Sequence, residues 1–261
     1  MISVSLDQLY SWINAFIFPF CRIGALMAFA PVFGDSAIPA RVKTYVALVL
    51  TMALAPALGP MPDVPPGSWT SIAIIMQQIV IGLAMGLSMR IVFAAIQVAG
   101  ELVGLQMGLS FATLLDPATG VNTTVLSRLF NIVALLLFLA LDGHLLMLAG
   151  FWHAYEVLPV SAAPLHMAGL GVLLEWGSQL LISGLLMSLP LITVLLSINL
   201  AMAILNRSAP QMSIFAVGFP VSLIVGLISL MIVLPRSDGF LANFFQQGLK
   251  TMMRIAQELA G

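Results

Sequence analysis

The stretch that decides the fold is residues 100–120, GELVGLQMGLSFATLLDPATG, which lies between two strongly apolar helical runs. Glycine recurs in its first half at every fourth position. This spacing gives a helix a smooth face against which another backbone can pack closely. The same spacing occurs one run earlier in the chain. The positions that we predict to pack against another helix are Gly82, Gly86, Gly100, Gly104 and Gly108.

The second half of this stretch cannot continue as an ordinary membrane-spanning helix. Asp116-Pro117 predicts a break, because proline lacks an amide donor and clashes with the preceding turn. Gly120 indicates a further turn. Glu101 and Asp116 are carboxylates in an apolar region, where such groups face protein or water and not lipid. We therefore predict a re-entrant loop that carries the function and is held by the surrounding helices.

The composition places the chain among membrane proteins. Of its 261 residues, 61% are hydrophobic and only 7% are charged, against roughly 25% charged residues in soluble proteins. The formal net charge of −1 and the lack of a basic run give no reason to expect nucleic acid. The single cysteine, Cys21, excludes a disulfide framework and is best interpreted as a small buried hydrophobe. We predict one all-α, polytopic integral membrane domain.

The apolar runs predict about six long hydrophobic helices arranged as hairpins. A run of some 30 residues reaches about 45 Å, more than the roughly 30 Å of a bilayer core. Helices of this length favour packing inside an assembly. The basic residues do not settle the topology. The positive-inside rule would place both the basic first loop and the basic tail inside, whereas six spans put them on opposite sides of the membrane. The predicted runs are 6–33, 41–57, 68–99, 122–141, 171–205 with a kink at Pro190, and 212–234, with a shorter apolar piece at 145–159.

The tail from Phe240 is amphipathic. Its apolar side chains share one helical face, and the opposite face carries polar residues, which predicts an interfacial or partner-binding helix. The apolar face contains Leu241, Phe244, Phe245, Leu249, Met252, Met253, Ala256 and Leu259. Arg22 interrupts the first apolar run, and a functional role, a structural pairing and a snorkelling side chain all remain open.

No pattern in the chain points to an enzyme. Its three histidines lack the HExxH spacing and cysteine partners of a metal site, and neither a GxSxG elbow nor a P-loop is present. Asp142 and His144 could relay a proton, although a polar pair at a helix end explains them more simply. We predict no catalytic residue, no metal and no cofactor.

Methionine is common, with 16 residues. Met107 and Phe111 lie in the glycine-rich stretch and could form a deformable seal, since the thioether chain adapts its shape. Filling of an apolar core is the alternative for both side chains, and it is the better explanation for most other methionines.

Three strings together resemble one family. They are GLQMGLSFATLLDPATG at 104–120, LLFLALDGH at 136–144 and NRSAPQMSIFAVGFP at 206–220. They resemble the FliR family, export-gate proteins of the flagellar type III secretion system that are similar to the SctT proteins of injectisomes. The resemblance covers essentially the full length. The family positions in the third string are Arg207, Pro210, Gln211, Gly218 and Pro220.

The resemblance implies a subunit of the bacterial inner membrane at the flagellar basal body. Family members join FliP- and FliQ-like subunits in one helical hetero-oligomer, with FlhB-like and FlhA-like subunits as further partners. Together they form the protein-conducting pore for unfolded flagellar proteins, which flagellum assembly needs. The implied parts are a FliP-like region at about 1–170 and a FliQ-like hairpin at about 171–235, and the amphipathic helix at about 240–260 follows them. Membrane lipid is a further expected partner of the chain.

The resemblance also implies that the loop after the third long helix is a plug that closes the pore. Carried onto this chain, the plug covers residues 104–120. The implied plug and gate positions are Gly104, Met107, Gly108, Phe111, Leu114, Leu115, Asp116, Pro117 and Gly120.

Two other functions compete with the gate. A secondary transporter of a small solute would also contain broken helices and buried charges, but it predicts internal repeats and a polar midplane site, which the sequence does not show convincingly. A non-gating assembly scaffold would use the glycine-rich stretch only for packing. Shortening the stretch separates these functions, because a gate would leak ions and a scaffold would fail to assemble.

Overall fold

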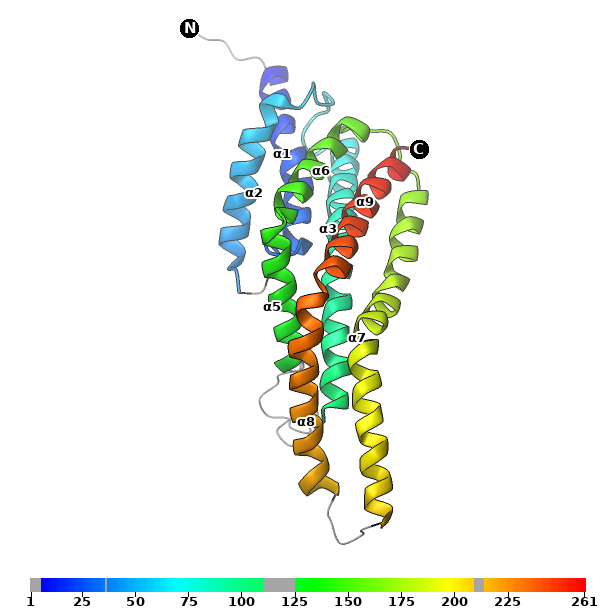
Figure 1. The fold of residues 1–261 in the computed structure, drawn as a ribbon. Helices are drawn as coiled ribbons and strands as arrows, with labels where there is room; N and C mark the ends of the chain where they lie inside the picture. The colour runs from blue at the N-terminus through cyan, green and yellow to red at the C-terminus, as the bar shows by residue number, and fades with distance from the viewer. Residues whose placement is uncertain (1–5, 36, 110–124, 209–213) are drawn as a thin grey trace. The chain divides into compact units, whose positions relative to one another are not determined.

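The computed structural model describes residues 6–35, 37–109, 125–208 and 214–261, and within these ranges every regular element is a helix (Figure 1). This confirms the prediction of an all-α fold. The α-helices are α1 (Leu6–Phe29), α2 (Ala40–Leu54), α3 (Trp69–Gln106), α5 (Val125–Ala140), α6 (Gly143–Val157), α7 (Ala168–Ser208), α8 (Ile214–Val233) and α9 (Asp238–Ala260).

The helices are long and apolar enough for a polytopic membrane protein. Five helices in the described ranges could cross a membrane by length and composition, and the bent pair α5 and α6 supplies a sixth span if it is counted as one. The prediction of about six spans is therefore confirmed. α3 contains 38 residues and α7 contains 41, so each is about 60 Å long and exceeds the bilayer core.

Several predicted boundaries need correction. α1 ends at Phe29 and not at residue 33, before the proline that follows at Pro31. α3 does not end at residue 99 but continues to Gln106, so the first part of the glycine-rich stretch is helical. α7 extends from Ala168 to Ser208, three residues beyond each predicted limit, and contains Pro190, where the kink stays a prediction.

The contacts between Cα atoms divide the chain into two compact units. Unit 1 contains Met1–Ile91, Asp142–Gly177 and Phe245–Gly261, and unit 2 contains Val92–Leu141 and Ser178–Phe244. Both units are built from segments far apart in the sequence, and α3, α7 and α9 each contribute to both. The division into FliP-like and FliQ-like parts stays a prediction.

Two glycines bring α1 and α3 close together in unit 1. A Cβ atom added to Gly82 would lie 2.1 Å from the carbonyl oxygen of Arg22, and one added to Gly86 would lie 3.0 Å from that of Leu26. The backbones therefore approach more closely than any larger residue would permit. Around this contact the core contains fully buried Phe18 and Met85.

The apolar face of α9 is covered by the chain itself, which corrects the prediction of an interfacial or partner-binding tail. In unit 1, the side chains of Met252 and Met253 lie against Gly150 of α6, and Leu259 lies against Gly169 at the start of α7. Met252 and Leu259 are almost completely buried. The amphipathic pattern was correct, but Met252, Met253 and Leu259 of its apolar face pack within unit 1.

Candidate functional site

The entry to the predicted plug is the C-terminal end of α3 in unit 2. Gly108 has a positive φ of 79°, which glycine adopts without strain. The amide of Leu109 donates to the carbonyl of Gly104 at 3.0 Å, and the amide of Gly108 donates to that of Leu105 at 3.1 Å. This pair of bonds is a Schellman motif. Gly108 therefore ends the helix, although the four-residue spacing indicates a place on a helix face.

Met107, the last residue before this left-handed turn, is only 1% exposed. Its side chain occupies the space beside Gly226 of α8. A Cβ atom added to Gly226 would lie 2.6 Å from Cε and 2.7 Å from Sδ of Met107. Met107 therefore attaches the end of α3 to α8 in this structure, and any sealing role stays a prediction.

The remainder of α3 in unit 2 packs closely against α5. A Cβ atom added to Gly100 would lie 2.6 Å from the Cα of Ser127, whose hydroxyl donates to the carbonyl of Gln97 at 3.1 Å. Phe93 and Phe138 meet edge to face with ring centroids 5.5 Å apart, a favourable aromatic geometry. Backbone contact, hydrogen bond and ring pair together fix α5 against α3.

α7 contacts α3 through a third glycine. A Cβ atom added to Gly184 would lie 2.8 Å from the carbonyl oxygen of Ala95 and 3.1 Å from Cγ1 of Val98. The part of α3 that leads to the predicted plug is thus held by α5, α7 and α8. At each contact a glycine removes the side chain that would keep the helices apart.

The contact between Met107 and Gly226 gives a prediction for a double-mutant cycle. Gly226→Ala alone forces the Met107 side chain to move and is expected to destabilise the chain by about 1–2 kcal/mol. In a Met107→Ala background the three atoms nearest to the new Cβ are absent, so its cost should fall to a few tenths of a kcal/mol. Thermal unfolding of the four purified proteins in detergent measures the coupling. If the destabilisation of the double variant equals the sum of those of the two single variants, the contact between Met107 and Gly226 is contradicted.

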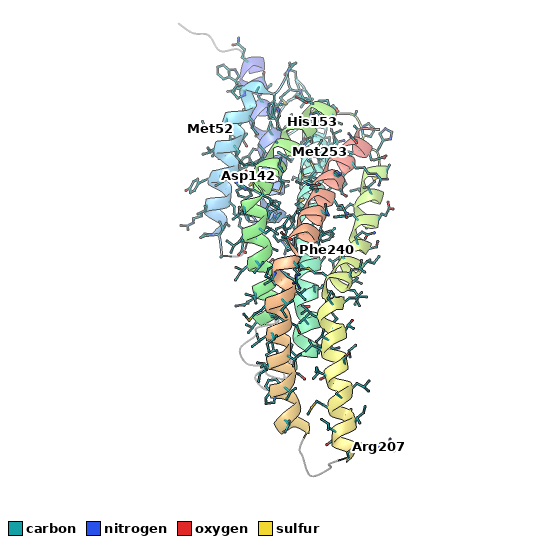
Figure 2. All side chains as sticks on the ribbon, in the orientation of Figure 1. Met52, Asp142, His153, Arg207, Phe240 and Met253 are labelled. Atoms are coloured by element: carbon teal, nitrogen blue, oxygen red, sulfur yellow. The ribbon has the colours of Figure 1, made fainter. Side chains whose placement is uncertain are left out.

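Other predicted positions lie elsewhere or outside the described residues. Arg207 lies exposed in the last turn of α7 (Figure 2), and Gly218 and Pro220 lie within α8. Gly104 is buried in the last turn of α3. The positions outside the described residues are Phe111, Leu114, Leu115, Asp116, Pro117, Gly120, Pro210 and Gln211.

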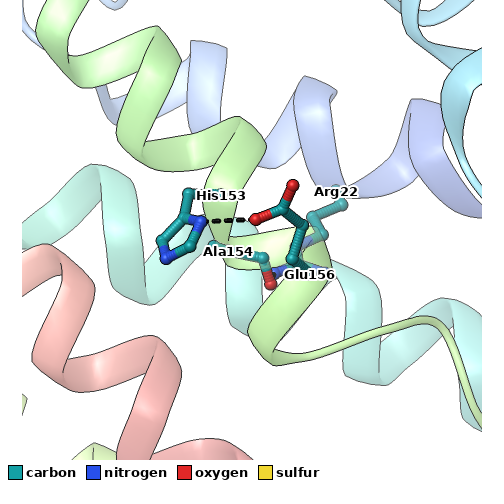
Figure 3. Close-up of polar contacts among 4 residues, drawn as sticks. All are labelled: Arg22, His153, Ala154 and Glu156. Atoms are coloured by element: carbon teal, nitrogen blue, oxygen red, sulfur yellow. Dashed lines mark hydrogen bonds and ion pairs between the residues drawn. The ribbon is translucent and has the colours of Figure 1, made fainter.

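Arg22 makes a structural pairing, one of the three roles that the sequence leaves open. It is 0% exposed, and its guanidinium donates to the carbonyls of Leu158 at 2.8 Å and Ala154 at 3.0 Å. Figure 3 shows it reaching the turn of α6 that carries Ala154. The guanidinium also lies 4.2 Å from the ring centroid of Tyr155. A buried cation thus caps the negative end of α6.

The polar groups near α6 include Asp142, His144, His153 and Glu156. Asp142 has a left-handed backbone and makes no capping bond with its side chain, and Nδ1 of His144 is buried without a hydrogen-bond partner among the described residues. His153 and Glu156 pair on the surface of the same helix (Figure 3). Within the described ranges no three His, Cys, Asp or Glu residues lie close enough to hold a metal ion.

Comparison with known proteins assigns the family. Residues 13–250 match the family described as "Bacterial export proteins, family 1". The chain belongs to the FliR family. It is 41% identical to the flagellar biosynthetic protein FliR of Escherichia coli over 259 residues, which cover 99% of both chains.

Two further relatives show the same full-length match. The chain is 43% identical to the FliR protein of Pectobacterium carotovorum over 260 residues, covering 100% of this chain and 99% of the relative. It is 27% identical to the FliR protein of Bacillus subtilis, covering 92% and 94%. Membership of this family assigns the chain to flagellar export, where it works with other export proteins, and its helices make it a multi-pass membrane protein.

Proposed function

We propose that this chain is a core subunit of the flagellar export gate in the bacterial inner membrane. It joins FliP- and FliQ-like subunits to form the protein-conducting pore for unfolded flagellar proteins. The segment that starts at Gly104 supplies the plug that closes this pore at rest. The chain has no enzymatic role in this proposal, and the energy for export comes from its partners or from the membrane potential.

The way in which the end of α3 is held carries the proposal. A plug must seal against ion flow without being released by thermal motion, so the helix that leads to it needs firm support. Glycine contacts join α3 to α5, α7 and α8 in unit 2, and the Schellman motif at Gly108 sets the direction in which the chain leaves the helix. These contacts support a rigid base for the loop.

The residues of the predicted plug have the chemistry of a hydrophobic seal. Phe111, Leu114 and Leu115 are apolar, and a narrow apolar constriction excludes ions by dewetting. Gly120 and Gly108 provide points about which the backbone can turn when a substrate arrives. The proposed closure of the pore at rest and its opening by movement of the loop therefore do not require a side chain that changes its charge.

Deleting residues 110–115 tests the proposal. In the export complex co-expressed with its neighbouring membrane genes, we expect this variant to assemble normally and to conduct ions at least tenfold more than the parent chain. The control is a deletion of three residues from the Pro/Gly-rich loop at 59–67, which should remain ion-tight. Ion flux in proteoliposomes and native mass measure the two properties.

The three functions give different results in this experiment. A shortened variant that assembles and stays ion-tight would overturn the plug assignment. Failure to assemble would support the scaffold. A lone chain that does not bind the neighbouring membrane proteins, and that transports a small solute, would support the transporter.

A further inference from the structure

Unit 1 contains a pocket that the export function does not explain. Its volume is about 200 Å³, and three segments form its wall: the first half of α3, the end of α6 with the loop after it, and the end of α9. This volume corresponds to roughly six or seven waters in the liquid, or to one large side chain. Its lining includes Gln77, Gln78, Ile81, Leu158, Ser161 and Leu259.

Gln78 is the unusual member of this wall. It is only 1% exposed, and its Oε1 atom is buried without a hydrogen-bond partner in the described part of the chain. A buried acceptor left unpaired costs about 1–3 kcal/mol. The neighbouring Gln77 also lines the pocket but is partly exposed, and its amide donates to the carbonyl of Ala163 at 3.1 Å. The wall of the pocket therefore contains a residue with one unused, buried acceptor.

The charges around the pocket favour a positive ligand. The C-terminal ends of α6 and α9 both contribute to the wall, and helix C-termini carry partial negative charge. Arg22 neutralises the end of α6. The last turn of α9 has no basic residue and instead contains Glu258. None of the described residues that line the pocket is Lys, Arg or His.

We propose that this pocket binds a guanidinium group, carried by an arginine side chain of another protein of the export apparatus. The wall combines apolar side chains such as Ile81 and Leu158 with an unpaired acceptor. A guanidinium is planar and weakly hydrated, so it enters such a wall more readily than an ammonium does. Its five donors can satisfy Gln78 and the carbonyls of a helix end together.

This inference does not depend on the plug. It requires only that the chain works with other export proteins. Gln78 lies in unit 1, whereas the base of the predicted plug belongs to unit 2. If the variant that lacks residues 110–115 stays ion-tight, the plug assignment is wrong and the proposal for the pocket is unaffected. The experiments below do not change the residues of the predicted plug.

The first test uses methylguanidinium at 10 mM on the full chain in detergent, with methylurea as its neutral analogue of similar shape. We expect amide hydrogen exchange in residues 157–165 to slow about fivefold with methylguanidinium, the factor for a ligand at four times its dissociation constant. Methylurea should change it less than 1.5-fold. A general denaturing effect would accelerate exchange and so has the opposite sign.

Two variants assign the effect to the buried amide. Gln78→Leu should abolish the protection, and it should not lower the melting temperature, because it removes an unpaired buried group. Gln246→Leu, a change at an exposed glutamine of α9 outside the pocket, should keep the protection. Three results would each overturn the site and leave a pocket filled by water. They are equal protection by methylurea, no protection by methylguanidinium in the parent chain, and unchanged protection in Gln78→Leu.

The second test asks whether a partner's arginine occupies the pocket. In the purified export complex, residues 157–165 should already be protected about fivefold without any probe, and added methylguanidinium should produce no further change. Gln78→Leu should remove this protection while Gln246→Leu retains it. A complex in which the segment exchanges as fast as in the isolated chain and still responds to methylguanidinium would overturn the partner.

Discussion

Replacing Gly82 by alanine is expected to destabilise the chain by about 3 kcal/mol, at the upper end of the range for overpacking. The new Cβ atom would lie 2.1 Å from the carbonyl oxygen of Arg22 and 3.0 Å from the Cβ of Ala25. The first of these is a backbone atom in α1, so no side-chain rotation relieves the clash. α1 and α3 would have to separate, and the core between them would lose contacts.

Gly24→Ala is the matched control for this prediction. Gly24 lies in α1, and an added Cβ there meets no atom within 4 Å. Alanine is a better helix former than glycine by about 0.8–1.0 kcal/mol, so this variant should be as stable as the parent or slightly more stable. Thermal unfolding in detergent and swarming on soft agar compare the two. Equal stability of both variants would contradict the close approach.

Replacing Arg22 by methionine is expected to cost about 3 kcal/mol. The change fills most of the same volume but removes both bonds to the end of α6, leaving the carbonyls of Leu158 and Ala154 buried without these donors. Hydrogen bonds to charged groups contribute about 1.5–3 kcal/mol each, and relief from burying a cation offsets part of this loss. The end of α6 should become the least protected part of unit 1.

Arg90→Met provides the control, because Arg90 is exposed and its guanidinium lies 5.8 Å from the ring centroid of Phe29. Its effect should stay within about 0.5 kcal/mol, as for most surface changes. Hydrogen exchange at residues 154–160 together with thermal unfolding gives the comparison. If Arg22→Met is as stable as Arg90→Met, the bonds to α6 do not hold the fold together.

The sequence predicted the helical framework because its signals are local. Long apolar runs interrupted by proline, glycine and charge identify spans, and the helices of the structure begin and end within a few residues of most predicted limits. α3 is the largest exception among the helix ends. Its helix continues through Gly100 and Gly104 because close packing against other helices outweighs the modest helix propensity of glycine.

The periodic glycines show how far pattern alone reaches. The spacing predicts small residues where helices meet, and close approach of a second helix is seen at Gly82, Gly86 and Gly100. It does not identify the partner helix, and it does not separate these positions from Gly108, whose left-handed backbone ends α3. A glycine that permits close approach and one that permits a positive φ are the same residue in a sequence, and only the backbone distinguishes them.

The sequence by itself determined the class of this protein, its spans, its family and the amphipathic character of α9. Tertiary structure decided which surfaces meet: Met107 lies against Gly226, Arg22 caps α6, and Met252, Met253 and Leu259 of α9 pack within unit 1. The physical reason is the range of the interactions. Hydrophobic periodicity and chain breaks act over a few residues, whereas these contacts join segments that lie far apart in the sequence, and packing chooses among many apolar faces that look alike in sequence.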